Sequence, residues 1–147
     1  FALYSDLRFA SDAAVFSTAF ARRGLIAEHG IAWILPRVVG PGHAADLLLS
    51  SRKVTAAEAL AMGLVNRLYA ADRLLDETLS YASDLATNVS PRSLRVIKRQ
   101  LWEAPYQTLA QATQLANDEM YRSLGSEDFK EGVAHFLERR PARFTGK

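Results

Sequence analysis

Residues 16–40 read FSTAFARRGLIAEHGIAWILPRVVG, and this stretch decides how the chain folds around any functional centre. Gly24 and Gly30 bracket a turn that carries Glu28 and His29, and an apolar helix is predicted to begin near Gly30. Such a helix directs its free amide groups and the positive end of its dipole back at the turn. We therefore expect the turn to suit an oxyanion or a bound water molecule.

The composition predicts one soluble domain with a substantial core. The chain has 147 residues, of which 49% are apolar and 23% charged, and no apolar run is long enough to span a membrane. A formal charge of +2 is too small and too dispersed to indicate nucleic-acid binding. The absence of cysteine excludes disulfides and thiolate sites, and it is compatible with the cytoplasm, where we place the protein.

The first residues predict short extended segments. Residues 2–10 mix small, aromatic and branched side chains and predict a buried strand, and residues 14–18 predict a second short extended piece. The chain begins at Phe1, without a methionine, directly before the first of these segments. We expect it to be the C-terminal half of a longer protein.

Capping signals divide the rest of the chain into helices. Pro41 is a favourable first residue for a buried helix that runs to Leu49, and Thr55 with Glu58 forms a capping box before a helix that ends at Gly63. Residues 64–69 predict an extended segment. Further helices are predicted at 72–88, 90–103, 108–124 and 127–139.

The last helices carry more apolar side chains than a thin bundle needs. The surplus includes Leu109, Leu115, Met120, Val133 and Phe136. Helices of this kind commonly pack on another domain or subunit. We expect them to form an interface.

Six segments, in order, resemble those of the crotonase superfamily, the enoyl-CoA hydratase/isomerase family. They read SDLRFAS, AVF with RRGLIAEHG, LPRVVG, SSRKVTAAEALAMGLVNRLYA, SPRSLRVIKRQL and SEDFKEGVAHFLERRPARF. The resemblance implies the C-terminal portion of an α/β fold, the ClpP/crotonase spiral, that is mostly helical in this part. Residues 1–70 then end the crotonase core and carry the active-site turn, and residues 71–147 form the helical trimerisation region.

The resemblance implies an unusual set of catalytic residues. Family hydratases use two glutamates; aligned through Asp6 and Phe16, the first falls immediately before Phe1 and the second falls on Phe20. Phenylalanine cannot donate or accept a proton, so Phe20 is non-catalytic at the usual glutamate position. Glu28 is the replacement candidate for acid or base. The alternative is that Glu28 only stabilises the N-terminus of the following helix.

The resemblance also implies a binding surface for coenzyme A, which is part of the substrate. Arg139 matches a family lysine that reaches the nucleotide part of coenzyme A, Met120 falls where some relatives have an aromatic residue near adenine, and Phe136 lies beside the basic residues. The alternative is a solvated helix end, where cations suit the dipole. The basic cluster comprises Arg139, Arg140, Arg143 and Lys147. No metal or redox cofactor is implied, and His43 and His135 have no metal-ligand spacing.

Two functions remain open. The first is an acyl-CoA enzyme, a hydratase or isomerase that acts through a thioester enolate held in an oxyanion hole. Its expected oxyanion donors lie upstream of Phe1, so this chain alone should be inactive. The second is a non-catalytic scaffold or assembly module. Either would form a homotrimer or hexamer with the missing N-terminal half, without nucleic-acid or membrane partners.

Overall fold

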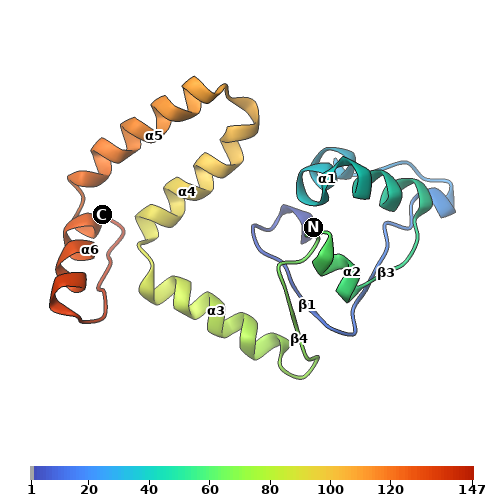
Figure 1. Cartoon of the computed structure of the whole chain (residues 1–147), viewed down its shortest axis with the longest axis horizontal. Helices are drawn as coiled ribbons and strands as arrows, with labels where there is room; N and C mark the ends of the chain where they lie inside the picture. The colour runs from blue at the N-terminus through green and yellow to red at the C-terminus, as the bar shows by residue number, and fades with distance from the viewer. Residues whose placement is uncertain (1) are drawn as a thin grey trace. The chain divides into compact units, whose positions relative to one another are not determined.

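The computed structural model describes residues 2–147, which form two compact units divided between Leu79 and Ser80. The first unit contains η1 (Ala2–Tyr4), β1 (Phe9–Ser11), β2 (Val15–Phe16), η2 (Ala21–Arg23), α1 (Ile31–Ser50), β3 (Val54–Thr55), α2 (Ala56–Ala61) and β4 (Arg67–Tyr69), where η denotes a 3₁₀ helix. Helix α3 (Leu74–Asn88) crosses the division. The second unit continues with α4 (Pro91–Glu103), η3 (Ala104–Tyr106), α5 (Leu109–Leu124) and α6 (Glu127–Glu138) (Figure 1).

The strands form two small sheets in the first unit. Strand β1 pairs in parallel with β4, with Ala10 opposite Leu68, and β2 pairs antiparallel with β3, with Phe16 opposite Val54. The prediction of a strand over residues 2–10 was wrong, because residues 2–4 form a 3₁₀ helix and β1 is only three residues long. A strand extends only as far as its neighbour supplies hydrogen bonds, and β4 offers three residues.

Helix α1 begins where the glycine turn predicted it. Gly30 is the N-cap with a left-handed backbone, and the helix runs from Ile31 to Ser50 with a kink at Gly40, whose φ is +80°. Pro41 follows the kink, so it opens the second half of the helix as predicted. The expectation that this second half is buried was correct only for the face that carries Ala44 and Leu47, since Leu49 is 80% exposed.

The apolar core of the first unit lies between α1, β3 and the segment around α2. Leu35 and Val54 are its largest fully buried side chains. The predicted capping box is confirmed: the Thr55 hydroxyl accepts the Glu58 amide, and the Glu58 carboxylate accepts the Thr55 amide. Gly63 then turns the chain with a φ of +78°. Leu64 and Val65 join the core before β4 begins, slightly later than predicted.

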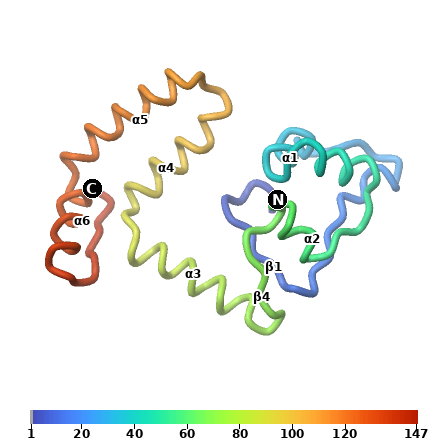
Figure 2. Tube along the Cα trace, in the orientation of Figure 1, coloured from blue at the N-terminus to red at the C-terminus, as the bar shows by residue number. Residues whose placement is uncertain are grey.

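The second unit is a set of capped helices. Helices α4 and α5 form a hairpin joined through η3, and α6 follows α5 (Figure 2). Ser90, Thr108 and Ser126 are the N-caps of α4, α5 and α6. Thr108 was predicted as the first residue of its helix and lies one position before it. Between residues 80 and 147 the buried residues are all polar: Ser90, Glu119 and Asp128. The apolar stripes of these helices are therefore largely exposed, including Ile97, Leu101, Leu109, Met120, Val133, Phe136 and Leu137.

Candidate functional site

The glycine turn has a left-handed backbone at two consecutive positions. The φ angles are +53° at His29 and +71° at Gly30, and the Ile31 amide donates to the Glu28 carbonyl over 3.0 Å. Positive φ at both central residues, with this hydrogen bond, is the pattern of a type I′ turn. Histidine tolerates this conformation less well than glycine does. The turn is therefore a tight, strained entry to α1.

The side chain of Glu28 is partly exposed at this turn. It is 39% exposed, and its Oε2 lies 3.7 Å from Nε2 of His29, whose own side chain is 87% exposed. Glu28 is the one carboxylate between β2 and α1. It lies one residue before the left-handed pair and at the N-terminal end of the helix, where the dipole favours a negative charge.

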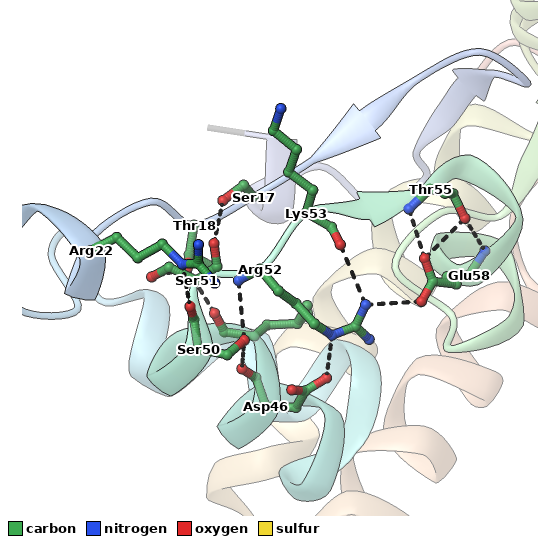
Figure 3. A network of polar contacts seen from close by, with 11 residues as sticks. Ser17, Thr18, Arg22, Asp46, Ser50, Ser51, Arg52, Lys53, Thr55 and Glu58 are labelled. Atoms are coloured by element: carbon green, nitrogen blue, oxygen red, sulfur yellow. Dashed lines mark hydrogen bonds and ion pairs between the residues drawn. The ribbon is translucent and has the colours of Figure 1, made fainter.

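A polar network anchors the segment that leads to Phe20. The Thr18 hydroxyl donates to the Leu47 carbonyl over 2.8 Å, and the Ser17 hydroxyl donates to the Ser51 carbonyl over 3.0 Å (Figure 3). The Ser51 hydroxyl in turn accepts the Ala21 amide over 3.1 Å. These bonds join the segment after β2 to the last turn of α1 and to its C-cap, Ser51. Phe20 is thereby held close to the C-terminal end of α1, in the segment that precedes the turn.

Arg52 extends this network from α1 to α2. Its guanidinium donates to Asp46 over 2.8 Å and to Glu58 over 2.9 Å (Figure 3). The Thr55 amide and the Arg52 guanidinium lower the pKa of Glu58 to about 2. The network is a structural support of the first unit, and sequence reasoning identified only its Thr55–Glu58 part.

An apolar cavity of about 540 Å³ opens beside the turn, a size typical of small-molecule sites. Its walls come from η1, β1, β2, both ends of α1, β3 and the segment before β4. Arg8 lines it and donates Nε to the Leu64 carbonyl over 2.7 Å. Burial lowers the pKa of Arg8, although Asp6 opposes the shift. Neither Glu28 nor Phe20 lines the cavity, which lies between the strand before the turn and the helix after it.

The three residues expected to contact coenzyme A lie on the surface of the second unit. Phe136 is 77% exposed on α6, and Arg139 is the C-cap of the same helix. Arg139 has a φ of +54°, a left-handed backbone conformation that glycine usually adopts at the end of a helix. Its side chain has no hydrogen bond or ion pair within residues 2–147. Met120, 49% exposed, lies on α5.

Within the basic cluster, Arg140 differs from Arg139 because its guanidinium is already bound to carboxylates of α6. Nη2 of Arg140 donates to Glu131 over 2.8 Å, its Nη1 donates to the second oxygen of Glu131, and its Nε donates to Glu138. Arg140, together with the Arg143 amide, lowers the pKa of Glu131 to about 2. Arg140 is therefore a structural residue that ties the tail of the chain to α6.

Two buried carboxylates of the second unit were missed by the sequence reasoning. Glu119 pairs with Arg92 and Arg122. Burial alone would raise the pKa of Asp128, but hydrogen bonds from Ser90, Thr145 and Gly146 lower it below its usual range. The partners of Asp128 are distant in sequence, so no local pattern identifies them.

Comparison with known proteins shows the family. The model of the enoyl-CoA hydratase/isomerase family matches residues 1–147. The chain is 34% identical to 1,2-epoxyphenylacetyl-CoA isomerase of Escherichia coli, an alignment that covers 99% of this chain and 55% of that protein. It is 38% identical to the probable enoyl-CoA hydratase echA12 of Mycobacterium leprae, over 95% of this chain and 48% of that protein.

The fold agrees with the sequence comparison. The structure superposes on the crystal structure of a probable enoyl-CoA hydratase/isomerase from Mycobacterium abscessus with a TM-score of 0.95 at 34% identity, over 99% of this chain and 57% of that one. The chain therefore belongs to the enoyl-CoA hydratase/isomerase, or crotonase, family and has a portion of the crotonase fold. It spans about half the length of the curated relatives it matches.

Within residues 2–147, no three histidine or acidic side chains are placed to share a metal ion. No helix in that range combines the length and the low charge needed to cross a membrane.

Proposed function

We propose that this chain is the C-terminal half of an acyl-CoA-processing enzyme that acts in the cytoplasm. The enzyme hydrates a double bond or shifts it through an enolate of the thioester, stabilised by oxyanion donors that the N-terminal half supplies. Family membership supports this proposal, as does the similarity to a protein named as an acyl-CoA isomerase. Coenzyme A enters as part of the substrate, and this half alone is inactive.

We propose that Glu28 is the general acid or base of this reaction, the group that gives a proton to the substrate or takes one from it. The supporting observation is its place on a tight turn at the start of α1, in a segment between β2 and α1 that holds no other carboxylate. Phe20 stands where the resemblance puts the usual second glutamate and has no proton to exchange. The Glu28 carboxylate, on the adjoining turn, performs the proton transfer that Phe20 cannot.

The test is Glu28→Gln in the full-length gene product. Glutamine keeps the size and hydrogen bonding of the side chain but removes its proton chemistry. We expect kcat to fall by about 10² to 10⁴, the usual contribution of a general acid or base, with coenzyme A affinity and thermal stability nearly unchanged. Glu77→Gln on α3, which removes an exposed i,i+4 ion pair with Arg73, is the matched control. A Glu28→Gln protein with normal kcat would assign Glu28 to the helix end.

The nucleotide part of coenzyme A is proposed to bind near the end of α6. Arg139 provides for the phosphates a guanidinium that has no partner within residues 2–147. Phe136 and Met120 provide exposed apolar surface for the adenine. The left-handed backbone of Arg139 supports this role. A non-glycine residue at that position costs stability, so the presence of arginine there favours a function for its side chain.

A non-catalytic scaffold is the second candidate, and Phe20 is the observation that favours it. A family member that lost its usual glutamate could keep the fold and the helical interface while losing turnover. In that case the full-length protein binds acyl-CoA or assembles normally, yet Glu28→Gln changes no measurable rate because the parent has none. Assay of the parent protein with a short 2-enoyl-CoA separates the two candidates.

Assembly is proposed to involve residues 71–147 as the trimerisation region, with residues 1–70 ending the catalytic core. The exposed apolar stripes of α4, α5 and α6 support an interface of this kind, because surfaces this apolar are usually covered. We propose a homotrimer, or a hexamer made of two trimers.

A further inference from the structure

Tyr4 contacts the Glu28 turn from a distant part of the chain. Its hydroxyl donates to the carbonyl oxygen of His29 over 2.7 Å, across 25 residues of sequence. Within residues 2–147, this is the one side-chain hydrogen bond that the backbone of residues 28–30 makes. The last residue of η1 is therefore tied to the middle of the turn.

The tyrosine hydroxyl also lies close to the next residue, Gly30. A Cβ atom on Gly30 would lie 2.9 Å from the Tyr4 hydroxyl oxygen, closer than real contacts of that kind. Gly30 also has a φ of +71°, which side chains disfavour. Glycine therefore suits this position both for its backbone conformation and for the space beside the Tyr4 hydroxyl.

The bonded carbonyl belongs to the central peptide of the turn. Turn types differ in the ψ angle before this peptide and the φ angle after it, so a change in its orientation alters the backbone that joins Glu28 to α1. A flip would turn the His29 carbonyl away from Tyr4 and break the hydrogen bond. His29 is strained in its present conformation, so the peptide needs such a restraint.

We propose that Tyr4 is a positioning residue for Glu28. By holding the His29–Gly30 peptide in one orientation, the Tyr4 hydroxyl keeps the Glu28 carboxylate directed for proton transfer to or from the acyl-CoA substrate. Tyr4 touches neither the substrate nor the proton; it acts through the turn. This inference rests on the proposed function of Glu28.

The test is a double-mutant cycle in the full-length gene product, assayed with a short 2-enoyl-CoA. Tyr4→Phe removes only the hydroxyl, and we expect kcat to fall about tenfold with KM unchanged, the scale of one lost hydrogen bond. In the Glu28→Gln background the same change should have no further effect, because Tyr4 acts through Glu28. Tyr121→Phe, an exposed tyrosine on α5, is the control and should leave kcat unchanged.

Hydrogen exchange of the Ile31 amide provides a readout that does not depend on activity. This amide donates to the Glu28 carbonyl across the turn. Tyr4→Phe should accelerate its exchange about tenfold while amides in the middle of α1 keep their protection. Unchanged Ile31 exchange overturns the inference, whatever the kinetics show.

The outcomes separate this inference from the proposed function. If Glu28→Gln is inactive but Tyr4→Phe keeps its kcat, the positioning role is wrong and the function of Glu28 stands. If Glu28→Gln keeps its kcat, the proposed function is wrong and the positioning role fails with it. Equal losses for Tyr4→Phe in both backgrounds show that the hydroxyl acts elsewhere, which also overturns the inference.

Discussion

Arg139 combines a strained backbone with a free cationic side chain, and the two properties can be separated by mutation. Glycine adopts a φ of +54°, the value of Arg139 at the end of α6, without strain. We expect Arg139→Gly to stabilise the full-length protein by about 0.5 to 1 kcal/mol and to weaken coenzyme A binding by about 1 to 2 kcal/mol. Denaturant unfolding and titration calorimetry measure the two effects.

The control for this prediction is Arg139→Ala. Alanine keeps the backbone strain and loses the guanidinium, so affinity should fall without a gain in stability. A dissociation constant that stays constant in both variants at low salt would show that Arg139 is only a charge at a helix end.

Glu131 makes stability depend on pH in the acid range. Its pairing with Arg140 lowers its pKa from an ordinary 4.5 to about 2. A depressed pKa means that the folded state binds the proton less readily than the unfolded state, so the stabilisation is complete above pH 4.5 and is lost as pH falls toward 2. We expect thermal midpoints to fall across this window, and Glu131→Gln to be less stable at neutral pH and less sensitive to acid.

Glu58 titrates in the same window in the first unit, because its pKa is also about 2. Glu58→Gln should therefore remove a different part of the acid dependence, and the two changes should add, since they lie in different units. An acid profile of Glu131→Gln that matches the parent would show that the Arg140 pair contributes nothing to folding.

At the scale of the element, Ser90 joins two helices through one hydroxyl. It accepts the Ser93 amide as the N-cap of α4, and it donates to the buried carboxylate of Asp128 in α6 over 2.5 Å. We expect Ser90→Ala to destabilise the protein by about 2 kcal/mol, since it removes a cap and a hydrogen bond to a buried charge. Urea unfolding checks this value.

Thr108 is the matched control, because it caps α5 in an exposed capping box with Gln111 and, within residues 2–147, bonds to no other helix. Thr108→Ala should cost only about 1 kcal/mol. Equal losses for the two variants would mean that the bond between Ser90 and Asp128 adds nothing beyond capping.

At the scale of the whole molecule, the exposed apolar stripes of the second unit predict assembly. The buried residues in that unit are polar, so its apolar side chains need a cover from outside it. We expect the full-length gene product to sediment as a trimer or as a dimer of trimers at micromolar concentration. A monomer under these conditions contradicts the proposed trimerisation region.

Sequence alone determined the features whose causes lie within a few residues. The helix starts at Ser90, Thr108 and Ser126 were predictable because a cap bonds to an amide three residues away. The entry to α1 was predictable because Gly30 permits a left-handed backbone. The family was also predictable, since six ordered segments resemble it and the family match covers the chain.

Only the tertiary structure decided the contacts between distant residues. The length of β1 depends on β4, the support of the turn comes from Tyr4 across 25 residues, and the state of Asp128 depends on Ser90 across 38. The same holds for Arg140, which reads as a free cation in the sequence and is bound to Glu131 in the fold. Each of these interactions exists only when folding brings the partners within hydrogen-bond distance, and no periodicity or local spacing encodes that approach.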